Sequence, residues 1–342
     1  MFTRILVPLD GSPLAEEAIP HAELFARIFR SSIILLHVLE SLPYKENPQA
    51  VDPLSWQIHK AEADQYMQGV ASRIREHLSN FYTDHDELES RVSYAVREGK
   101  TAENIVDFAH AESIDLLIIS THGASGLSRW NMSSITQKVA NLVYLPVLIV
   151  RAYYRSWTGE EMRRYQKILL PIDGSRRAEC SLAPGIELAR ANAMADTPPD
   201  ENAVEPPKLV LAAVIRPPEL PIPTPIPAEV NQLLEQLMEV SRQVVKRYLD
   251  EMKERLPVAC ETCVVENPSI TSAIQELADQ EDVDLVVLCA HGFSGQGAWP
   301  YGTIARNYME HGNKPVLVIQ DVPHAQARPT AAEMAAEKVG RR

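Results

Sequence analysis

Two identical Asp-Gly-Ser triplets, at residues 10–12 and 173–175, are the first segments of this chain whose side chains could do chemistry. Each follows a short apolar run. The glycine and serine are typical of a tight turn followed by the N-cap of a helix. The aspartates, Asp10 and Asp173, precede the cap, and their carboxylates could accept hydrogen bonds from a ribose or from nearby backbone amides. The triplets therefore predict either a plain turn or one wall of a nucleoside site.

A second pair of segments, STHG at 120–123 and CAHG at 289–292, precedes loops that lead into expected helices. In the later loop, nine residues separate Gly292 from Gly302 and Thr303. Glycine lets backbone N–H groups approach a phosphate, the start of a helix adds free N–H donors, and threonine adds a hydroxyl. Turns alone also explain many such loops. Together with the neighbouring Asp-Gly-Ser triplet, this spacing favours a nucleotide site in the second half of the chain.

The matching loop of the first half ends differently, because Ser133 and Ser134 stand where the second half has Gly302 and Thr303. A Cβ at position 133 hinders the close approach of a phosphate to the backbone, whereas Ser134 retains the hydroxyl. We therefore expect weaker nucleotide binding in the first half.

Other conspicuous residues predict structure rather than chemistry. His122 and His291 have no Cys, Asp or Glu close by at metal-ligand spacing, so we expect hydrogen-bonded loop histidines. The GKT triplet at 99–101 lacks the upstream glycine of a Walker motif, since Tyr94 stands there, and predicts a turn into a helix. The CETC segment at 260–263 lies in a strand-like run, in which positions three apart point to opposite faces. The sequence thus predicts no metal site.

The elements that must position these residues occur twice, because the chain is an internal repeat. ILVPLDGS recurs as ILLPIDGS with six of eight letters identical, and DLLIISTHGASG recurs as DLVVLCAHGFSG with six identities. PVLIV recurs as PVLVI. The paired segments are 5–12 with 168–175, 115–126 with 284–295, and 146–150 with 315–319.

Each copy alternates apolar strands with helical patterns, which predicts a parallel sheet covered on both faces. In such sheets ligands bind at the carboxyl ends of the strands, where the Asp, His and Gly residues fall. The predicted fold class is α/β, with two tandem, Rossmann-like, doubly wound parallel-sheet domains. We expect domains at 1–152 and 165–320, a linker at 153–164 and a tail at 321–342. In the first copy, strands are expected at 4–9, 32–39, 91–98, 115–120 and 146–150, and helices at 13–30, 55–79, 102–112 and 134–143.

Composition narrows the classes of partner. The 342 residues include 33 basic and 46 acidic ones, and the net charge of −13 argues against nucleic acid. The sequence has no apolar run of membrane-spanning length and no signal-peptide layout, so we expect a cytoplasmic protein without a membrane partner. The proline-rich segment 216–227 predicts a stiff connection or a polyproline ligand.

These motifs, in order and twice, resemble a tandem member of the universal stress protein family. The resemblance covers residues 1–152 and 165–320 and implies an adenine-nucleotide α-hydrolase-like fold that binds ATP, with Mg²⁺ as a possible companion. It places nucleoside contacts on Asp173 with Val214, and on Asp10 with Val38.

The ATP-binding branch of that family carries Gly-x-x-Gly, nine residues, and then Gly-Ser or Gly-Thr. The second copy matches at Gly292, Gly302 and Thr303 and departs at Cys289. The first copy matches at Gly123 and Ser134 and departs at Ser120 and Ser133. The resemblance therefore implies ATP binding in the second copy more than in the first.

The resemblance also implies partners and an output. Family members commonly dimerise through the last strand, so segments 146–150 and 315–319 could pair within one chain as a pseudo-dimer, and a homodimer of chains is open. The function implied is a stress-response sensor or regulator. Without a Walker lysine or an evident acid–base pair, at most slow ATP hydrolysis is expected. The alternative is a nucleotide-free scaffold of the same fold.

Overall fold

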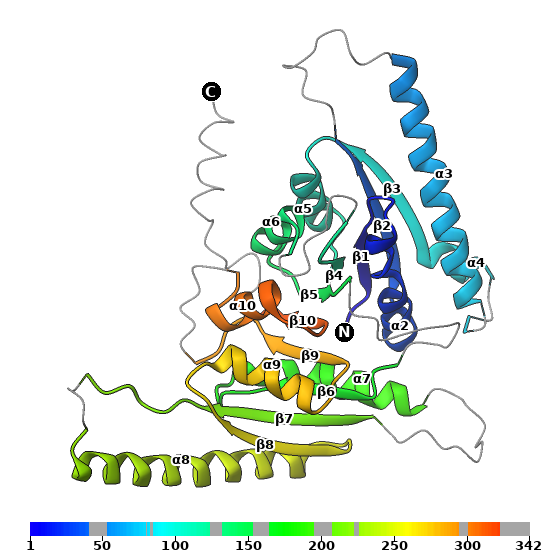
Figure 1. Ribbon diagram of the computed structural model, residues 1–342. Helices are drawn as coiled ribbons and strands as arrows, with labels where there is room; N and C mark the ends of the chain where they lie inside the picture. The colour runs from blue at the N-terminus through cyan, green and yellow to red at the C-terminus, as the bar shows by residue number, and fades with distance from the viewer. Residues whose placement is uncertain are drawn as a thin grey trace. The chain divides into compact units, whose positions relative to one another are not determined.

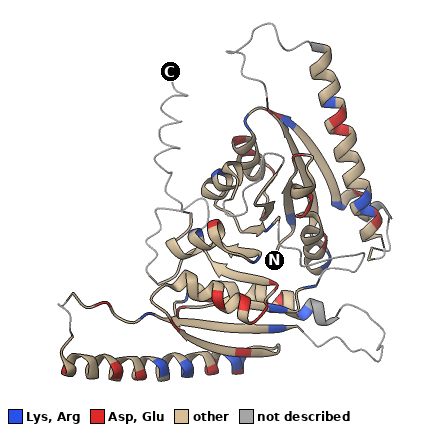
Figure 2. Cartoon of the chain, in the orientation of Figure 1, with Lys and Arg blue, Asp and Glu red and all other residues tan. Residues whose placement is uncertain are grey.

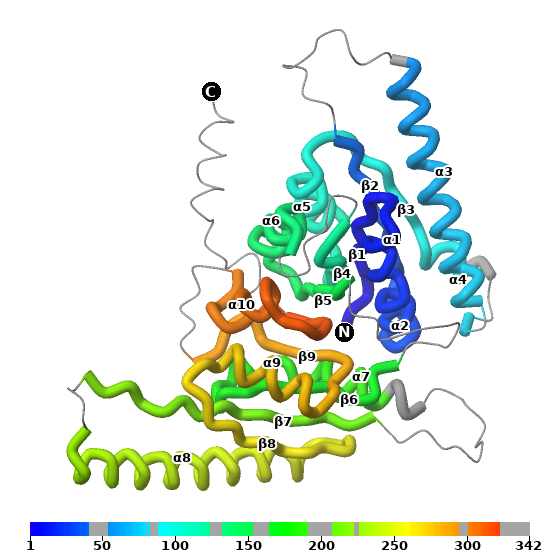
Figure 3. Tube along the Cα trace, in the orientation of Figure 1, coloured from blue at the N-terminus to red at the C-terminus, as the bar shows by residue number. Residues whose placement is uncertain are grey.

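The computed structural model describes residues 1–40, 53–79, 81–82, 85–123, 132–152, 164–194, 207–221, 226–293 and 300–321. The chain divides into two compact units, of which unit 1 is built on Met1–Arg164 and unit 2 on Tyr165–Gln296 with Gly302–Asp321. Each unit alternates strands and helices along the chain (Figure 1, Figure 3).

Unit 1 contains the elements that the first repeat predicts. It also contains a short helix at 85–91, which the sequence did not predict. Its elements are β1 (Arg4–Pro8), α1 (Pro13–Glu16), α2 (Ile19–Phe29), β2 (Ser32–Leu39), α3 (Pro53–Leu78), α4 (His85–Arg91), β3 (Val92–Glu98), α5 (Thr101–Ala111), β4 (Leu116–Ser120), α6 (Ser134–Leu142) and β5 (Val147–Val150).

Unit 2 repeats this order with two differences: a short 3₁₀ helix, η1, stands in the place of α1, and the described residues between α8 and β8 contain no counterpart of α4. Its elements are β6 (Lys167–Pro171), η1 (Ala178–Ser181), α7 (Leu182–Met194), β7 (Lys208–Ile215), α8 (Ala228–Arg255), β8 (Cys260–Glu266), α9 (Ile270–Gln280), β9 (Leu285–Cys289), α10 (Thr303–His311) and β10 (Val316–Ile319).

The strands of each unit are parallel, which confirms the predicted fold class. Unit 1 has the strand order β3-β2-β1-β4-β5, and unit 2 has the order β8-β7-β6-β9-β10. In unit 1, Ile5 of β1 lies in register with Ile33 of β2 and Leu116 of β4. In each unit the strands that follow the first strand are added on one side of it and then on the other, so the strand order reverses at β1 and at β6. A crevice opens at such a point, at the carboxyl ends of the strands. The predicted pairing of the two last strands remains a prediction.

Continuous apolar runs form the core because parallel strands are covered on both faces. Every residue of β4 and of β9 is buried. In unit 1, α2 and α3 lie on one face of the sheet and α5 and α6 on the other (Figure 1). The candidate residues stand at or just beyond the carboxyl ends of these buried strands.

The long helices are tied to the short helices, α1 and η1, that follow the first strand of each unit. The Tyr66 hydroxyl of α3 donates to Glu16 Oε1 at 2.8 Å, and the Tyr248 hydroxyl of α8 donates to Glu179 Oε1 at 2.9 Å. Burial, followed by these hydrogen bonds, raises the pKa of both tyrosines. The equivalent contact therefore holds the short helix that follows the Asp-Gly-Ser segment in each unit.

One expected helix is divided in the structure. The segment 13–30 forms α1 and α2 rather than one continuous helix, and Pro20 stands in the first turn of α2. A proline is tolerated there because the first N–H groups of a helix have no intrahelical partner.

The surface carries mixed charge. Figure 2 shows Lys and Arg alternating with Asp and Glu on α3 and α8 rather than forming a basic face. Within the described part of the chain, no helix has the length and apolar character needed to cross a bilayer.

Candidate functional site

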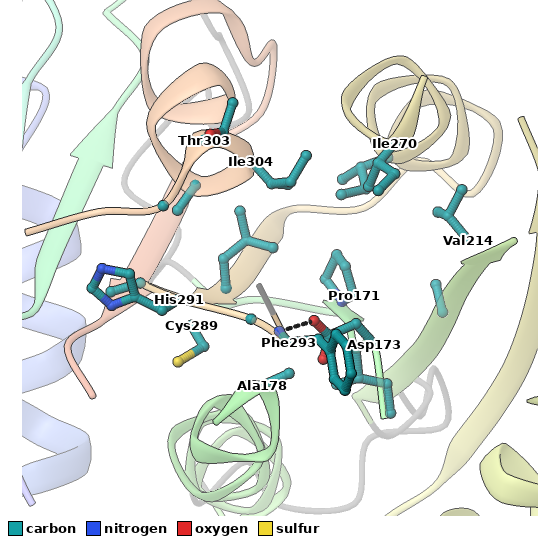
Figure 4. A pocket seen from close by; sticks show the side chains of 18 residues that line it. Pro171, Asp173, Ala178, Val214, Ile270, Cys289, His291, Phe293, Thr303 and Ile304 are labelled. Atoms are coloured by element: carbon teal, nitrogen blue, oxygen red, sulfur yellow. Dashed lines mark hydrogen bonds between the residues drawn. The ribbon is translucent and has the colours of Figure 1, made fainter. Parts of the chain in front are cut away.

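A cavity of about 330 Å³ opens in unit 2 at the carboxyl ends of β6, β7 and β9. The first turns of α9 and α10 and the start of η1 complete its wall (Figure 4). All seven residues that the sequence proposed for the second site line it: Asp173, Val214, Cys289, His291, Gly292, Gly302 and Thr303.

Asp173 is held by the backbone on two sides. Its Oδ1 accepts a hydrogen bond from Ser175 N at 3.0 Å, and its Oδ2 accepts one from Phe293 N at 2.7 Å. Gly174 has φ = +78°, which lets the chain turn back toward this carboxylate. Asp173 therefore accepts hydrogen bonds from nearby backbone amides, which is one of the two roles that the sequence suggested for it. Each carboxylate oxygen keeps a second lone pair for another donor.

Gly292 is required by Asp173 rather than by a phosphate alone. A Cβ at position 292 would overlap the Asp173 carboxylate, and a Cβ at Gly123 would overlap Asp10 in the same way. The aspartate after the first strand and the glycine after the fourth strand are therefore one packed pair. The sequence placed them at neighbouring strand ends but gave no sign that they touch.

The first turn of α10 faces the cavity with its N–H groups. Among the described residues no side chain caps this helix, whose N-cap is Gly302 and whose first residues, Thr303 to Ala305, line the cavity. Gly302 N donates to Ala290 O at 2.7 Å, which anchors the turn onto the end of β9. An uncapped helix N-terminus binds anions, because its free N–H groups and the helix dipole both favour negative charge.

His291 lies at one edge of the cavity and is held by an acid. Its Nδ1 lies 2.7 Å from Asp321 Oδ1, and both side chains are buried. Arg177 Nε lies 3.5 Å from the other oxygen of Asp321. The histidine is thus hydrogen-bonded, as predicted for a loop histidine.

The remaining wall of the cavity is apolar. It includes Val214 with Pro171, Ala212, Ile270 and Ile274, and Figure 4 shows Ile270 and Val214 on the side of the cavity away from His291. The sequence did not single out Ile270 or Ile274, because they read as an ordinary buried helix face.

Unit 1 contains the corresponding cavity, of about 290 Å³. Of the seven residues that the sequence proposed there, Asp10, Val38, Ser120, His122, Gly123 and Ser133 line it. Ser134 is exposed in the first turn of α6 and is absent from this lining. Thr101, of the GKT segment, also lines the cavity and donates to Glu40 Oε1 at 2.6 Å, where the turn leads into α5 as predicted.

The two helix N-termini differ in the way that matters for an anion. In unit 1 the Ser133 Oγ caps α6 by accepting a hydrogen bond from Thr136 N at 3.1 Å. The Thr136 hydroxyl in turn donates to Ser120 O at 2.9 Å. Ser133 therefore occupies the Thr136 N–H group in the first turn of α6, whereas no side chain caps the first turn of α10. This hydrogen bond adds to the steric hindrance that the sequence predicted from the Cβ of Ser133.

Charge differs in the same direction. Glu40 directly follows β2 and lines the unit 1 cavity, whereas Arg216 occupies the equivalent chain position after β7. Glu40 adds a second carboxylate to the wall of the unit 1 cavity, and its negative charge disfavours a polyphosphate there. Arg216 is not among the described residues that line the unit 2 cavity, which therefore lacks this second carboxylate. The segments HVLE (37–40) and AVIR (213–216) contain this difference in the sequence. The structure is needed to show that their last residues directly follow β2 and β7.

Two parts of the predicted site lie outside the described residues: segments 124–131 and 294–299 of the loops after β4 and β9. The CETC segment is in β8, as its strand-like pattern predicted. In the described part of the chain, no group of three His, Cys, Asp or Glu side chains is placed to hold a metal ion.

Comparison with known proteins agrees with this architecture. The model of the universal stress protein family matches residues 1–151 and 201–320. Universal stress proteins MJ0531 and MJ0577 of Methanocaldococcus jannaschii are each 26% identical, over 152 and 156 residues. These alignments cover 44% of this chain and 83% and 96% of the two relatives.

Solved structures extend the likeness of fold to most of the chain. PA1789, a functionally unknown protein of Pseudomonas aeruginosa, has a TM-score of 0.59 at 17% identity, covering 93% of this chain and 92% of that one. A universal stress protein of Archaeoglobus fulgidus has a TM-score of 0.52 at 12% identity, covering 93% and 98%. With both halves matched by the family model and the repeat carried through both sheets, this chain is a member of the universal stress protein family with two tandem domains.

Proposed function

We propose that this tandem universal stress protein binds an adenine nucleotide, ATP with Mg²⁺, in the cavity of unit 2 and acts as a stress-response sensor or regulator. The observation that carries the proposal is the pairing of an anchored carboxylate with an uncapped helix start across one cavity. Asp173 is the anchored carboxylate, and the first turn of α10, which begins at Thr303, is the uncapped helix start.

The nucleoside fits the wall formed by Asp173 and the apolar residues. The free lone pairs of the Asp173 carboxylate can accept hydrogen bonds from the two ribose hydroxyls. The adenine ring then lies among Val214, Ile270 and Ile274, where burial of its apolar faces contributes to affinity.

The phosphates fit the opposite wall. The N–H groups of Thr303, Ile304 and Ala305 belong to the first turn of α10, and the Thr303 hydroxyl is exposed beside them. Mg²⁺ commonly binds phosphate oxygens and water rather than an all-protein cage. Such an ion would need no cluster of ligands in the cavity.

We infer that the nucleotide is bound rather than rapidly turned over. Asp173 is engaged by two backbone amides, and no lysine or arginine is among the described residues that line the cavity. The cavity of unit 1, with Ser133 capping α6 and Glu40 at its wall, is expected to bind ATP weakly.

Titration of ATP with Mg²⁺ against the nucleotide-free full chain is expected to give one tight equivalent per chain. Isothermal titration calorimetry measures this stoichiometry directly. Denaturing the freshly purified protein and separating any released nucleotide by chromatography provides an independent check. A protein that is both empty and unable to bind added ATP would support the nucleotide-free scaffold, and two equal sites would remove the role given to Ser133.

A further inference from the structure

Two thiols face each other beneath the cavity of unit 2. The Sγ atoms of Cys180, in η1, and Cys289, the last residue of β9, lie 2.8 Å apart, and both cysteines are free. Cys289 is buried and lines the cavity, whereas Cys180 is partly exposed. Figure 4 shows the Cys289 sulfur directed toward the helix that carries Ala178.

The geometry is close to that of a disulfide. A disulfide bond is about 2.05 Å long, so the sulfurs need to approach by less than about 1 Å. Both sides of the pair are fixed by other contacts. Cys289 ends the buried strand β9 and lies in register with Ile319 of β10, and two hydrogen bonds hold η1 on the Cys180 side. Ala178 N donates to Ser175 Oγ at 3.1 Å, and Glu179 accepts from Tyr248 at 2.9 Å. The thiols are therefore held as neighbours rather than meeting by chance motion.

The pair is particular to unit 2. At the equivalent positions of unit 1 the chain has Glu17 and Ser120. Cys260 and Cys263 stand three residues apart on β8, so their side chains point to opposite faces of that strand. Cys289 also stands where the ATP-binding motif has its first glycine. Its thiol lies next to that of Cys180, so this substitution creates a pair of thiols.

We propose that Cys180 and Cys289 are a redox-active pair, which hydrogen peroxide converts into a reversible disulfide that links η1 to the end of β9. One thiolate attacks a peroxide oxygen, so that an S–O bond forms, the O–O bond breaks, and the departing hydroxide takes up a proton as water. The second thiol attacks this sulfenic sulfur, forming the S–S bond and releasing a second water. Two sulfurs together lose two electrons, and the peroxide is reduced to two waters.

The surroundings set the threshold for this reaction. The hydrogen bond to Cys289, followed by burial, raises the pKa of the Cys180 thiol. Since the thiolate is the reactive form, dilute peroxide reacts slowly and sustained oxidant is needed. The bond then ties together the loop after Asp173 and the strand end before Gly292, which are two walls of the cavity.

The test uses full-length protein with the other two cysteines replaced, Cys260→Ser and Cys263→Ser. The replacement is needed because no Lys or Arg lies between residues 256 and 306, so trypsin leaves three cysteines on one peptide. After peroxide treatment, free thiols are blocked with N-ethylmaleimide in denaturant and the digest is analysed by mass spectrometry. We expect the peptide containing Cys180 to be linked to the peptide containing Cys289, and dithiothreitol to release both.

The matched control adds Cys289→Ser, which installs the residue that unit 1 has at Ser120. It is expected to fold and to form no link, so that the peptide containing Cys180 is recovered unlinked, as the blocked thiol or as its own sulfur acid. Two fully blocked thiols after peroxide in the parent variant, or a link only between separate chains, would overturn the proposal. Detection of the linked peptides requires no nucleotide. The absence of a disulfide and the absence of ATP binding are therefore separate results.

Discussion

The substitution Gly302→Asp is expected to weaken ATP binding about 100-fold, a loss of roughly 3 kcal/mol. Gly302 is the N-cap of α10, and the N–H groups of that helix start face the cavity. An aspartate there caps the helix as Ser133 caps α6, and it also adds a negative charge beside the phosphates. Hydrogen bonds to charged groups contribute about 1.5–3 kcal/mol each, so the loss of one or two accounts for this size of effect.

Isothermal titration calorimetry of the full chain measures the change, with two matched variants beside it. Gly302→Ser copies the cap of unit 1 without the charge and is expected to give a smaller loss. Its Cβ would lie 3.2 Å from Ala290 O, a tight but tolerable contact. Ser133→Asp alters unit 1 alone and is expected to leave the tight site intact. Abolition of binding by Ser133→Asp alone would show that the site belongs to unit 1.

The second large effect concerns stability. The substitution Gly292→Ala is expected to destabilise unit 2 by about 1–3 kcal/mol, since the new methyl group overlaps the Asp173 carboxylate. Relief of that overlap must displace Asp173 from Ser175 N or Phe293 N, so the nucleoside wall is lost as well.

Hydrogen exchange read by mass spectrometry follows each unit separately, which a single unfolding curve of a two-unit chain does not. Exchange is expected to quicken in unit 2 for Gly292→Ala and in unit 1 for Gly123→Ala. The control is Gly69→Ala, an exposed position in α3 where a Cβ meets nothing within 4 Å. Because alanine favours a helix by up to about 1 kcal/mol over glycine, this control is expected to slow exchange slightly.

A double-substitution cycle identifies the cause. If the clash with the carboxylate is responsible, Gly292→Ala costs less in an Asp173→Ala background than in the wild type. An equal cost in both backgrounds would assign the effect to the glycine backbone instead of the packed pair.

The sequence by itself determined the repeat, the strand and helix order, the fold class and the family. Those features are local or periodic: apolar runs predict buried strands, and the Asp-Gly-Ser and Gly-Thr segments mark strand ends and helix starts. It also identified the contrast between Gly302 and Ser133 as the difference between the halves. Its helix over 13–30 was wrong in continuity, because a second helix begins at Ile19 with Pro20 in its first turn.

Only the tertiary structure decided which residues touch. The contact of Asp173 with Gly292, the hold of Asp321 on His291 and the approach of Cys180 to Cys289 join residues separated by many positions in the chain. No periodic pattern encodes such contacts, because they depend on the order of strands in the sheet and on where each strand ends. The same holds for the cap on α6. A serine at position 133 is read from the sequence, but its occupation of the Thr136 amide depends on the fold.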